Sequence, residues 1–155
     1  MSAKVDGKAA AGGEFVTFRL QGQLMGLPVL DVHDVLAAQK ITRVPLAPPA
    51  VAGVLNLRGR IVTAIDLRTR LGLPPRDVSE SYMCIVVEHK GEPYSLLIDA
   101  VGDVLTLSQK QFEANPITLN AHWRSISRGI FRLDDELLVA VDVDRLLDFG
   151  LAAAA

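Results

Sequence analysis

The side chains that most often do chemistry in proteins are few and scattered in this chain of 155 residues. His33, His89 and His122 have no cysteine or second histidine at the spacing of a metal site, and His89 is expected in a turn. The single cysteine, Cys84, lies within the apolar run MCIVVE, where a thiol is more often inert than nucleophilic. No glycine-rich loop between a strand and a helix offers a phosphate site. The sequence therefore predicts a protein without metal or other cofactor that is not an enzyme.

Asp66 and Asp142 resemble a catalytic pair of carboxylates until their contexts are compared. Each aspartate follows an apolar, strand-like run and precedes a short helical pattern. An aspartate at that boundary accepts hydrogen bonds from the first backbone amides of the helix. We therefore expect two helix caps.

Arginines concentrate in one stretch that contains no aromatic residue between positions 19 and 81: Arg58, Arg60, Arg68, Arg70 and Arg76. Proteins that bind single-stranded nucleic acid alternate basic residues with stacking rings, so this pattern supports nucleic-acid binding only weakly. The net charge of −2 gives no overall attraction for nucleic acid or anionic lipid. All but Arg58 are predicted to form a solvated basic face. Arg58 is different because Arg58-Gly59 is the predicted tip of a hairpin.

The elements that would position these residues are predicted from a repeat. The segment Gly53–Gly72, GVLNLRGRIVTAIDLRTRLG, predicts a strand, a turn, a strand and a short helix. The same pattern recurs 76 residues later as Gly129–Asp148, and an upstream segment recurs at an offset of 69 residues. The chain is therefore predicted to be a tandem duplication with copies at approximately 15–72 and 84–148, the second carrying a seven-residue insertion between Leu107 and Ser127.

Composition and turn spacing indicate how such a copy folds. Half of the residues are apolar but only 5% are aromatic, so Val, Leu, Ile and Ala must fill the core, which favours strands. A copy of about 60 residues with closely spaced hairpins predicts a small barrel or rolled sheet that is marginal alone. Two barrels packed together would leave a groove at their seam. The segment Leu30–Leu36 could be one helical turn or a further strand, and its apolar spacing weakly favours a short helix. A strand is expected around Ile41–Leu46. Most apolar residues of positions 29–36 are expected in the core, and one or two could line the groove.

The ends of the chain differ from its middle. Residues 1–13 are rich in Ala, Gly and Lys and are predicted to be a disordered tail; 14–149 form the folded domain, and 150–155 a C-terminal tail. The start lacks the apolar core of a signal peptide, and no apolar run approaches the ~20 residues of a membrane helix. Together with the lone cysteine, these features predict a soluble, cytosolic protein.

The segment GVLNLRGRIVTAIDLRTRLG resembles the hallmark segment of the CheW coupling proteins of bacterial chemotaxis. GLPVLDVHDVL before it and LLIDAVGDVLTLS after it resemble the family at corresponding places, and the likeness runs from Glu14 to Phe149. Thr63 departs from the proline that the family usually has, which bears only on a local kink. The resemblance implies a mainly β fold of two SH3-like, five-stranded β-barrels side by side, with short helices.

The resemblance also implies a function. Family members are adaptors that bridge the cytoplasmic tips of methyl-accepting chemoreceptors to the histidine kinase CheA and help to assemble the receptor array, without binding nucleic acid or inserting into the membrane. The positions that match receptor- or kinase-coupling positions of the family are Val32, Asp34, Gly53, Arg58 and Val104.

The resemblance gives each of these positions an expected part. Val32 and Val104 would contact a receptor helix in the groove, and Arg58 would pair with a carboxylate at its edge. Gly53 is expected to be structural, and Asp34 is either a rim charge or a local cap. The kinase would dock end-on to a barrel.

Two alternatives stay open from the sequence. The same fold serves as the regulatory domain of a CheA kinase or the coupling half of a CheV protein. A small nucleic-acid-binding barrel is the alternative of another class, and it would lose affinity steeply as salt rises.

Overall fold

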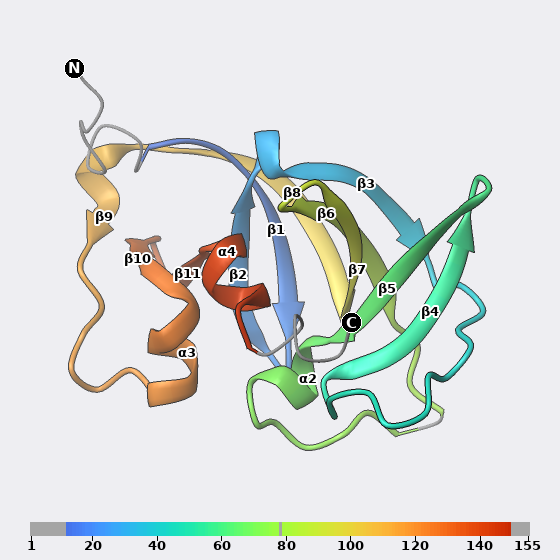
Figure 1. The fold of residues 1–155 in the computed structure, drawn as a ribbon. Helices are drawn as coiled ribbons and strands as arrows, with labels where there is room; N and C mark the ends of the chain where they lie inside the picture. The colour runs from blue at the N-terminus through green and yellow to red at the C-terminus, as the bar shows by residue number, and fades with distance from the viewer. Residues whose placement is uncertain (1–11, 78, 150–155) are drawn as a thin grey trace.

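The computed structural model describes residues 12–77 and 79–149, and in them the chain forms two antiparallel-rich sheets that lie side by side (Figure 1). The six-stranded sheet has the order β8 (Ala100–Leu107), β1 (Gly13–Leu20), β2 (Gln23–Pro28), β11 (Leu137–Val141), β10 (Ser127–Arg132) and β9 (Phe112–Glu113). The five-stranded sheet has the order β3 (Val32–Ala37), β6 (Met83–His89), β7 (Glu92–Ile98), β5 (Arg60–Asp66) and β4 (Val51–Leu57). The prediction of a mainly β fold with two SH3-like units side by side is confirmed, although one of the two sheets has six strands and not the predicted five.

The helices are short and lie between or after strands. They are η1 (Val29–Asp31), α2 (Leu67–Arg70), η2 (Gln109–Gln111), α3 (Ala121–Ile126) and α4 (Val143–Leu147). Asp66 caps α2 by accepting a hydrogen bond from the Arg68 amide, and Asp142 caps α4 by accepting one from the Arg145 amide. The interpretation of both aspartates as helix caps is confirmed.

The repeat is visible in the order of the elements. An offset of 69 residues takes β1, β2 and β3 onto β6, β7 and β8, and an offset of 76 takes β4, β5 and α2 onto β10, β11 and α4. Even the irregularities correspond, because the β4–β5 register shifts between Val51 and Gly53 and the β10–β11 register between Ser127 and Gly129. The stretch between Leu107 and Ser127 that carries the predicted insertion holds η2, β9 and α3.

The sheets, however, cut across the repeats. The β1–β2 hairpin of the first repeat pairs with β8 and, in parallel, with β11 of the second repeat. Reciprocally, the β6–β7 hairpin of the second repeat pairs with β3 and β5 of the first. The expectation that each repeat builds its own barrel is therefore wrong. Two similar copies present equivalent strand edges, so their sequences do not specify which copy supplies the hairpin.

The hydrophobic core consists of one cluster shared by both sheets and two smaller clusters, each within one sheet. The largest buried cluster combines Phe18 and Met25 of the six-stranded sheet with Ile85 and Leu96 of the five-stranded one. A second cluster lies within the six-stranded sheet, where the Phe131 ring meets Phe15 and Phe112 edge to face. The third lies within the five-stranded sheet and includes Cys84, which is fully buried, as predicted for an inert core thiol. The shared cluster makes the two sheets one folding unit.

Two local predictions are wrong. The preference for a helix over Leu30–Leu36 is wrong: the 3₁₀ turn η1 ends at Asp31, and the alternative, a strand, is found in β3, because pairing with β6 overrides a weak helical spacing. Between Ile41 and Leu46 only Thr42 makes a β-bridge, to Val54. The prolines at 45, 48 and 49 supply no backbone N–H for a longer ladder.

The predicted tails at 1–13 and 150–155 fall mostly outside the described residues, although Gly13 already begins β1. In the part of the chain that the structure describes, none of the helices combines the length and the apolar character that crossing a bilayer requires.

Candidate functional site

The β4–β5 hairpin extends from the five-stranded sheet (Figure 1). Arg58 lies between the two strands, at the tip of this hairpin. Arg58 has a φ of 54° and Gly59 one of 83°, and the Gly59 amide donates a hydrogen bond of 3.0 Å to Asn56 Oδ1. A turn with two consecutive positive φ values is the tight hairpin type that favours glycine. The prediction that Arg58 stands at a hairpin tip is confirmed, and its side chain is 77% exposed.

Arg58 is joined to a second predicted site residue, Asp34. The Arg58 Nη2 lies 3.0 Å from Asp34 Oδ2, and the other carboxylate oxygen accepts a hydrogen bond of 2.9 Å from the Val35 amide. Asp34 is therefore both a local backbone cap and the partner of a charge from another strand. The two residues form one charged feature, the Asp34–Arg58 pair, which joins β3 at one margin of the five-stranded sheet to the β4–β5 hairpin at the other.

Val32 and Val104 lie on different sheets. Val32 on β3 is half-buried and packs against the shared core. Val104 on β8 is 56% exposed. The position that corresponds to Val104 at the 69-residue offset is Val35, which is also exposed on β3. Because β3 and β8 are the edge strands of their sheets, each sheet carries one exposed valine at its margin.

Gly53 has a backbone role. Its φ is +149°, and a Cβ at this position would come within 2.2 Å of the Thr42 carbonyl oxygen and 2.7 Å of Ile41 Cγ2. No side chain fits there, so Gly53 holds β4 against the Thr42 bridge. Gly129 repeats this arrangement beside Phe112.

The prediction of a solvated basic face is wrong for three of its arginines. Arg68 and Arg76 have side chains that are only 8% and 9% exposed. Arg70 donates to the carbonyl oxygens of Leu146 and Arg145 at the end of α4. Arg60 is exposed, as predicted. Arginine count alone does not distinguish a solvated guanidinium from one that is paired in the interior.

Asp99 is the residue that pairs the two buried arginines, and sequence reasoning missed it. The Asp99 carboxylate accepts hydrogen bonds from Arg68 Nε and Nη2 at 3.0 and 2.8 Å. It also accepts one from Arg76 Nη2 at 2.6 Å and one from the Gln21 amide at 2.7 Å. Burial by itself would raise the pKa of Asp99, but the hydrogen bonds from Arg68, Gln21 and Arg76 outweigh it and lower the pKa to about 2. The signal in the sequence was a charge at a position where the first repeat has Leu30.

His89 is also placed differently from the prediction. It is buried at the end of β6, and its Nδ1 lies 3.0 Å from the exposed Asp144 carboxylate of α4. His89 therefore contributes to the contact between the five-stranded sheet and α4. The described residues contain no group of three or more histidine, cysteine or acidic side chains arranged to hold a metal ion.

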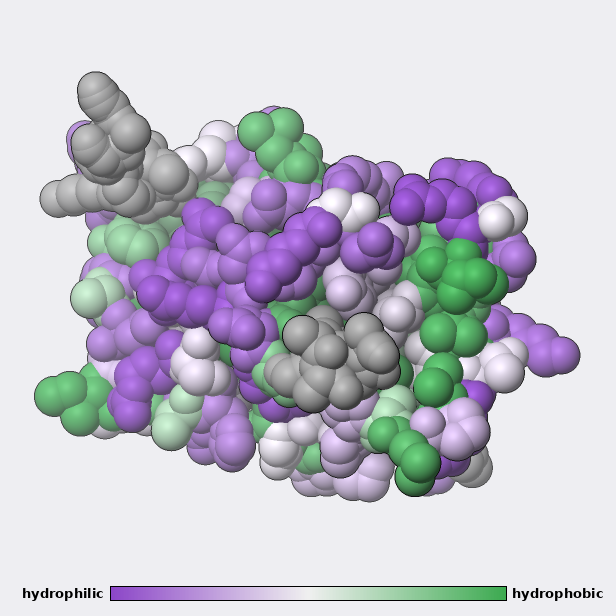
Figure 2. Space-filling model, in the orientation of Figure 1, coloured by the Kyte–Doolittle hydropathy of each residue, from purple (hydrophilic) through white to green (hydrophobic). Residues whose placement is uncertain are grey.

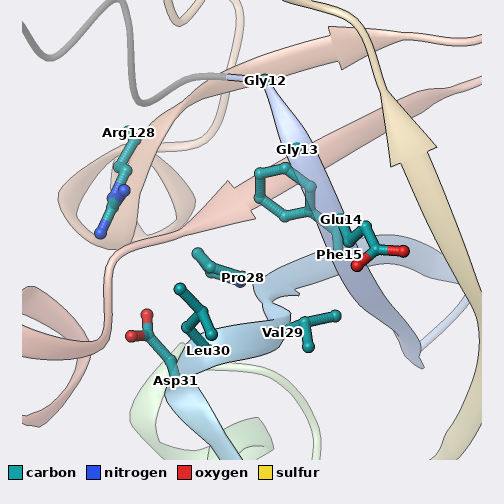
Figure 3. A pocket seen from close by; sticks show the side chains of 9 residues that line it. All are labelled: Gly12, Gly13, Glu14, Phe15, Pro28, Val29, Leu30, Asp31 and Arg128. Carbon is teal, nitrogen blue, oxygen red and sulfur yellow. The ribbon is translucent and has the colours of Figure 1, made fainter.

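A pocket of about 460 Å³ opens where β1 begins, beside η1 (Figure 3). Phe15, Pro28 and Val29 form apolar walls, and Leu30, 93% exposed, stands at its rim. Its charged lining residues are Glu14, Asp31 and Arg128. Burial raises the pKa of the Asp31 carboxyl; Arg128 opposes the rise, and Asp144 of α4 and its N-cap Asp142 add to it.

Exposed apolar side chains also gather over the β4–β5 hairpin (Figure 2). Ile61 on β5 is 65% exposed and lines a shallow hollow of about 340 Å³ together with Lys40, Thr42 and Val54. A strand that is apolar outward as well as inward is unusual for a one-sided sheet. This hairpin surface is a second candidate contact region, separate from the margins that carry Val35 and Val104.

Comparison with known proteins gives one consistent result. The chain is 31% identical to the chemotaxis protein CheW of Klebsiella aerogenes, covering 88% of this chain and 82% of that protein. It is 30% identical to the chemotaxis protein CheW of Rhizobium meliloti, covering 86% of each. The crystal structure of the scaffolding protein TtCheW from Thermoanaerobacter tengcongensis superposes with a TM-score of 0.79 at 31% identity, covering 90% of this chain and 94% of that one. The family model described as the CheW-like domain matches residues 14–149, and the chain thus belongs to the CheW family.

Proposed function

We propose that this chemotaxis protein is a non-catalytic adaptor that couples chemoreceptors to the histidine kinase CheA and works in the cytoplasm at receptor arrays. The observation that carries the proposal is that the family match spans residues 14–149, so that the likeness to a scaffolding protein covers the whole described domain.

The receptor is proposed to bind at the margins of the two sheets. Val104, with Val32 and Val35 on β3, supplies apolar surface for one face of a receptor helix, the usual mode by which an amphipathic helix is bound. The Asp34–Arg58 pair supplies a charged edge. Arg58 is mostly exposed, so its guanidinium has donors left for a carboxylate of the receptor.

The kinase is proposed to bind the other apolar surface, at the hairpin that carries Ile61. This surface lies at the end of the five-stranded sheet, in keeping with end-on docking. An adaptor needs two contact surfaces that can be occupied together. The apolar parts of the two regions lie on different strands, Ile61 on β5 and the valines on β3 and β8, while Arg58 at the hairpin tip belongs to the receptor region.

The test is a capture experiment with the purified chain immobilised, using a receptor-tip fragment and CheA as separate and joint probes. The unmodified chain is expected to retain both. Val104→Glu is expected to lose the receptor fragment and keep CheA, while Ile61→Glu does the reverse, because a buried, unpaired carboxylate is costly at an apolar contact. Ala121→Glu, at the exposed start of α3 on the opposite side of the molecule from the β4–β5 hairpin (Figure 1), adds the same single charge and is the control. Failure of the unmodified chain to retain either probe would overturn the proposal.

A further inference from the structure

The chain crosses between the two sheets at two corresponding places. The first crossover is η1, between β2 of the six-stranded sheet and β3 of the five-stranded one; the second is Asp99, between β7 and β8. At the 69-residue offset Asp99 corresponds to Leu30. Leu30 projects into solvent, whereas the Asp99 side chain is only 19% exposed. The duplicated scaffold thus has one crossover that ends in an open pocket and one that ends in a network of charges.

The network converges on a single carboxylate. Asp99 accepts two hydrogen bonds from the fork of Arg68, one from Arg76 and one from the Gln21 amide, while its own amide donates to the Arg19 carbonyl at 3.2 Å. Bidentate arginine–carboxylate bonds fix direction as well as distance. Both guanidinium groups are almost fully buried, so little water competes for these bonds.

The partners of Asp99 come from three separate parts of the fold. Arg68 lies on α2 at the end of the five-stranded sheet, and Gln21 lies in the β1–β2 turn of the six-stranded sheet. Arg76 comes from the connection between the two repeats, where its guanidinium also lies 5.6 Å from the centre of the Tyr82 ring. Asp99 therefore binds both sheets and the connection at the point where β8 begins.

We propose that Asp99, Arg68 and Arg76 form a latch that sets the angle between the two sheets and thereby positions Val104 relative to β3 for the receptor. This inference rests on the proposed function, because Val104 and β3 matter as a pair only if one partner contacts both. The shared apolar core holds the sheets together but has no preferred direction. The directional hydrogen bonds of the latch fix the angle between the sheets. Strand β8, which carries Val104, begins directly after Asp99, so its position follows from that angle.

The direct test measures the distance between the sheets. Val35→Cys and Val104→Cys in one chain take spin labels at exposed positions, while the native Cys84 is buried. Double electron–electron resonance is expected to give a narrow distance distribution in this chain. Asp99→Asn is expected to broaden or shift it, since the amide replaces a charge that two buried arginines require. Glu113→Gln is the matched control, because it removes an equally bidentate but exposed pair with Arg132.

A second variant guards against loss of folding. Arg76→Met removes the hydrogen bond from the inter-repeat connection to Asp99 and leaves the Arg68–Asp99 pair intact. A smaller broadening of the distance distribution is therefore expected. Folding of each variant is checked by its thermal transition. An unchanged distance distribution in both folded variants, or in Arg76→Met where Asp99→Asn does not fold, would overturn the latch.

Capture by the partners separates this inference from the proposed function. A variant with a loosened latch is expected to bind the receptor-tip fragment about tenfold more weakly, within the range that indirect positioning residues produce, and to keep its affinity for CheA. Equal receptor affinity of Asp99→Asn and the unmodified chain would overturn the latch alone. Failure of the unmodified chain to bind either partner would overturn the proposed function instead.

Discussion

The contrast between Arg58 and Arg68 shows that the same side chain does different work according to its surroundings. Both pair with an aspartate at hydrogen-bonding distance. Arg58 is open to water, where the Coulomb attraction of a pair is weak and salt screens it. Arg68 is enclosed, and loss of its partner would leave a buried charge uncompensated. Substitution of Arg58 should therefore change binding more than stability, and substitution of Arg68 should change stability more than it would at an exposed site.

Arg58→Ala is expected to weaken receptor-tip binding and to leave the thermal midpoint nearly unchanged, because an exposed pair contributes about 0–1 kcal/mol to stability. Arg60→Ala, the exposed neighbour on β5, is the control and should change neither quantity. The measurements are calorimetric melting and titration of the receptor fragment. A large drop in midpoint without a selective binding defect would mean that Arg58 is structural.

Asp99 should make stability depend on acidity. Its folded pKa of about 2 lies below the ordinary value of 3.8, so its contribution is fully present above about pH 4 and is lost as the pH falls toward 2. The difference corresponds to about 2 kcal/mol. Urea unfolding at a series of pH values should therefore show Asp99→Asn to be less stable than the unmodified chain at pH 7, with a gap that narrows on acidification. A gap independent of pH would contradict this assignment.

At the scale of elements, the strands follow from local pattern and their partners do not. Alternating apolar residues and the turns at Gly22, Gly59 and Gly91 locate the hairpins in the sequence. The repeat offsets locate the bulges and caps as well. The exchange of hairpins could not be predicted, since corresponding edges of two similar copies offer the same hydrogen bonds. The sequence left β3 undecided between a short helix and a strand, because pairing with β6, remote in sequence, decides its conformation.

For the candidate site too, the local features could be predicted from the sequence and the long-range contacts could not. The tip position of Arg58 follows from local turn chemistry, and the glycine requirement at position 53 follows from the repeat. The contact between Asp34 and Arg58 depends on how the fold brings β3 next to the tip of the β4–β5 hairpin. The burial of Arg68 depends on the Asp99 carboxylate, which is 31 residues away in the sequence. Such long-range pairs leave no periodic trace in a single sequence.

Gly53→Ala tests the element that carries the hairpin. The added Cβ would collide with the Thr42 carbonyl in a strained backbone region, so a loss of about 3 kcal/mol or more is expected. Gly59→Ala is the matched control: its φ is also positive, but the space around it is open, so about 1–2 kcal/mol is expected. Chemical denaturation compares the two. Equal losses would show that strain alone, without the close approach, governs position 53.

At the scale of the whole molecule, the interlocked sheets should make unfolding all-or-none. Every strand of the first repeat has partners in the second directly or through one neighbour, and the largest core cluster spans both sheets. The full chain is expected to give a single thermal transition. A fragment ending at Asp77 is expected to show none, because β3 and β5 would lack the β6–β7 hairpin between them. Cooperative melting of that fragment, followed by circular dichroism, would contradict this prediction.

The reciprocal placement of the two hairpins has a consequence for ancestry. A chain with one repeat could complete its sheet only by taking the hairpin of a second molecule, which is the arrangement of a domain-swapped homodimer. The connection from Leu71 to Tyr82 would then be the join that fused two such subunits into one polypeptide. In such a fused chain the halves would be free to diverge, and the aspartate at one crossover and the leucine at the other would reflect that loss of symmetry.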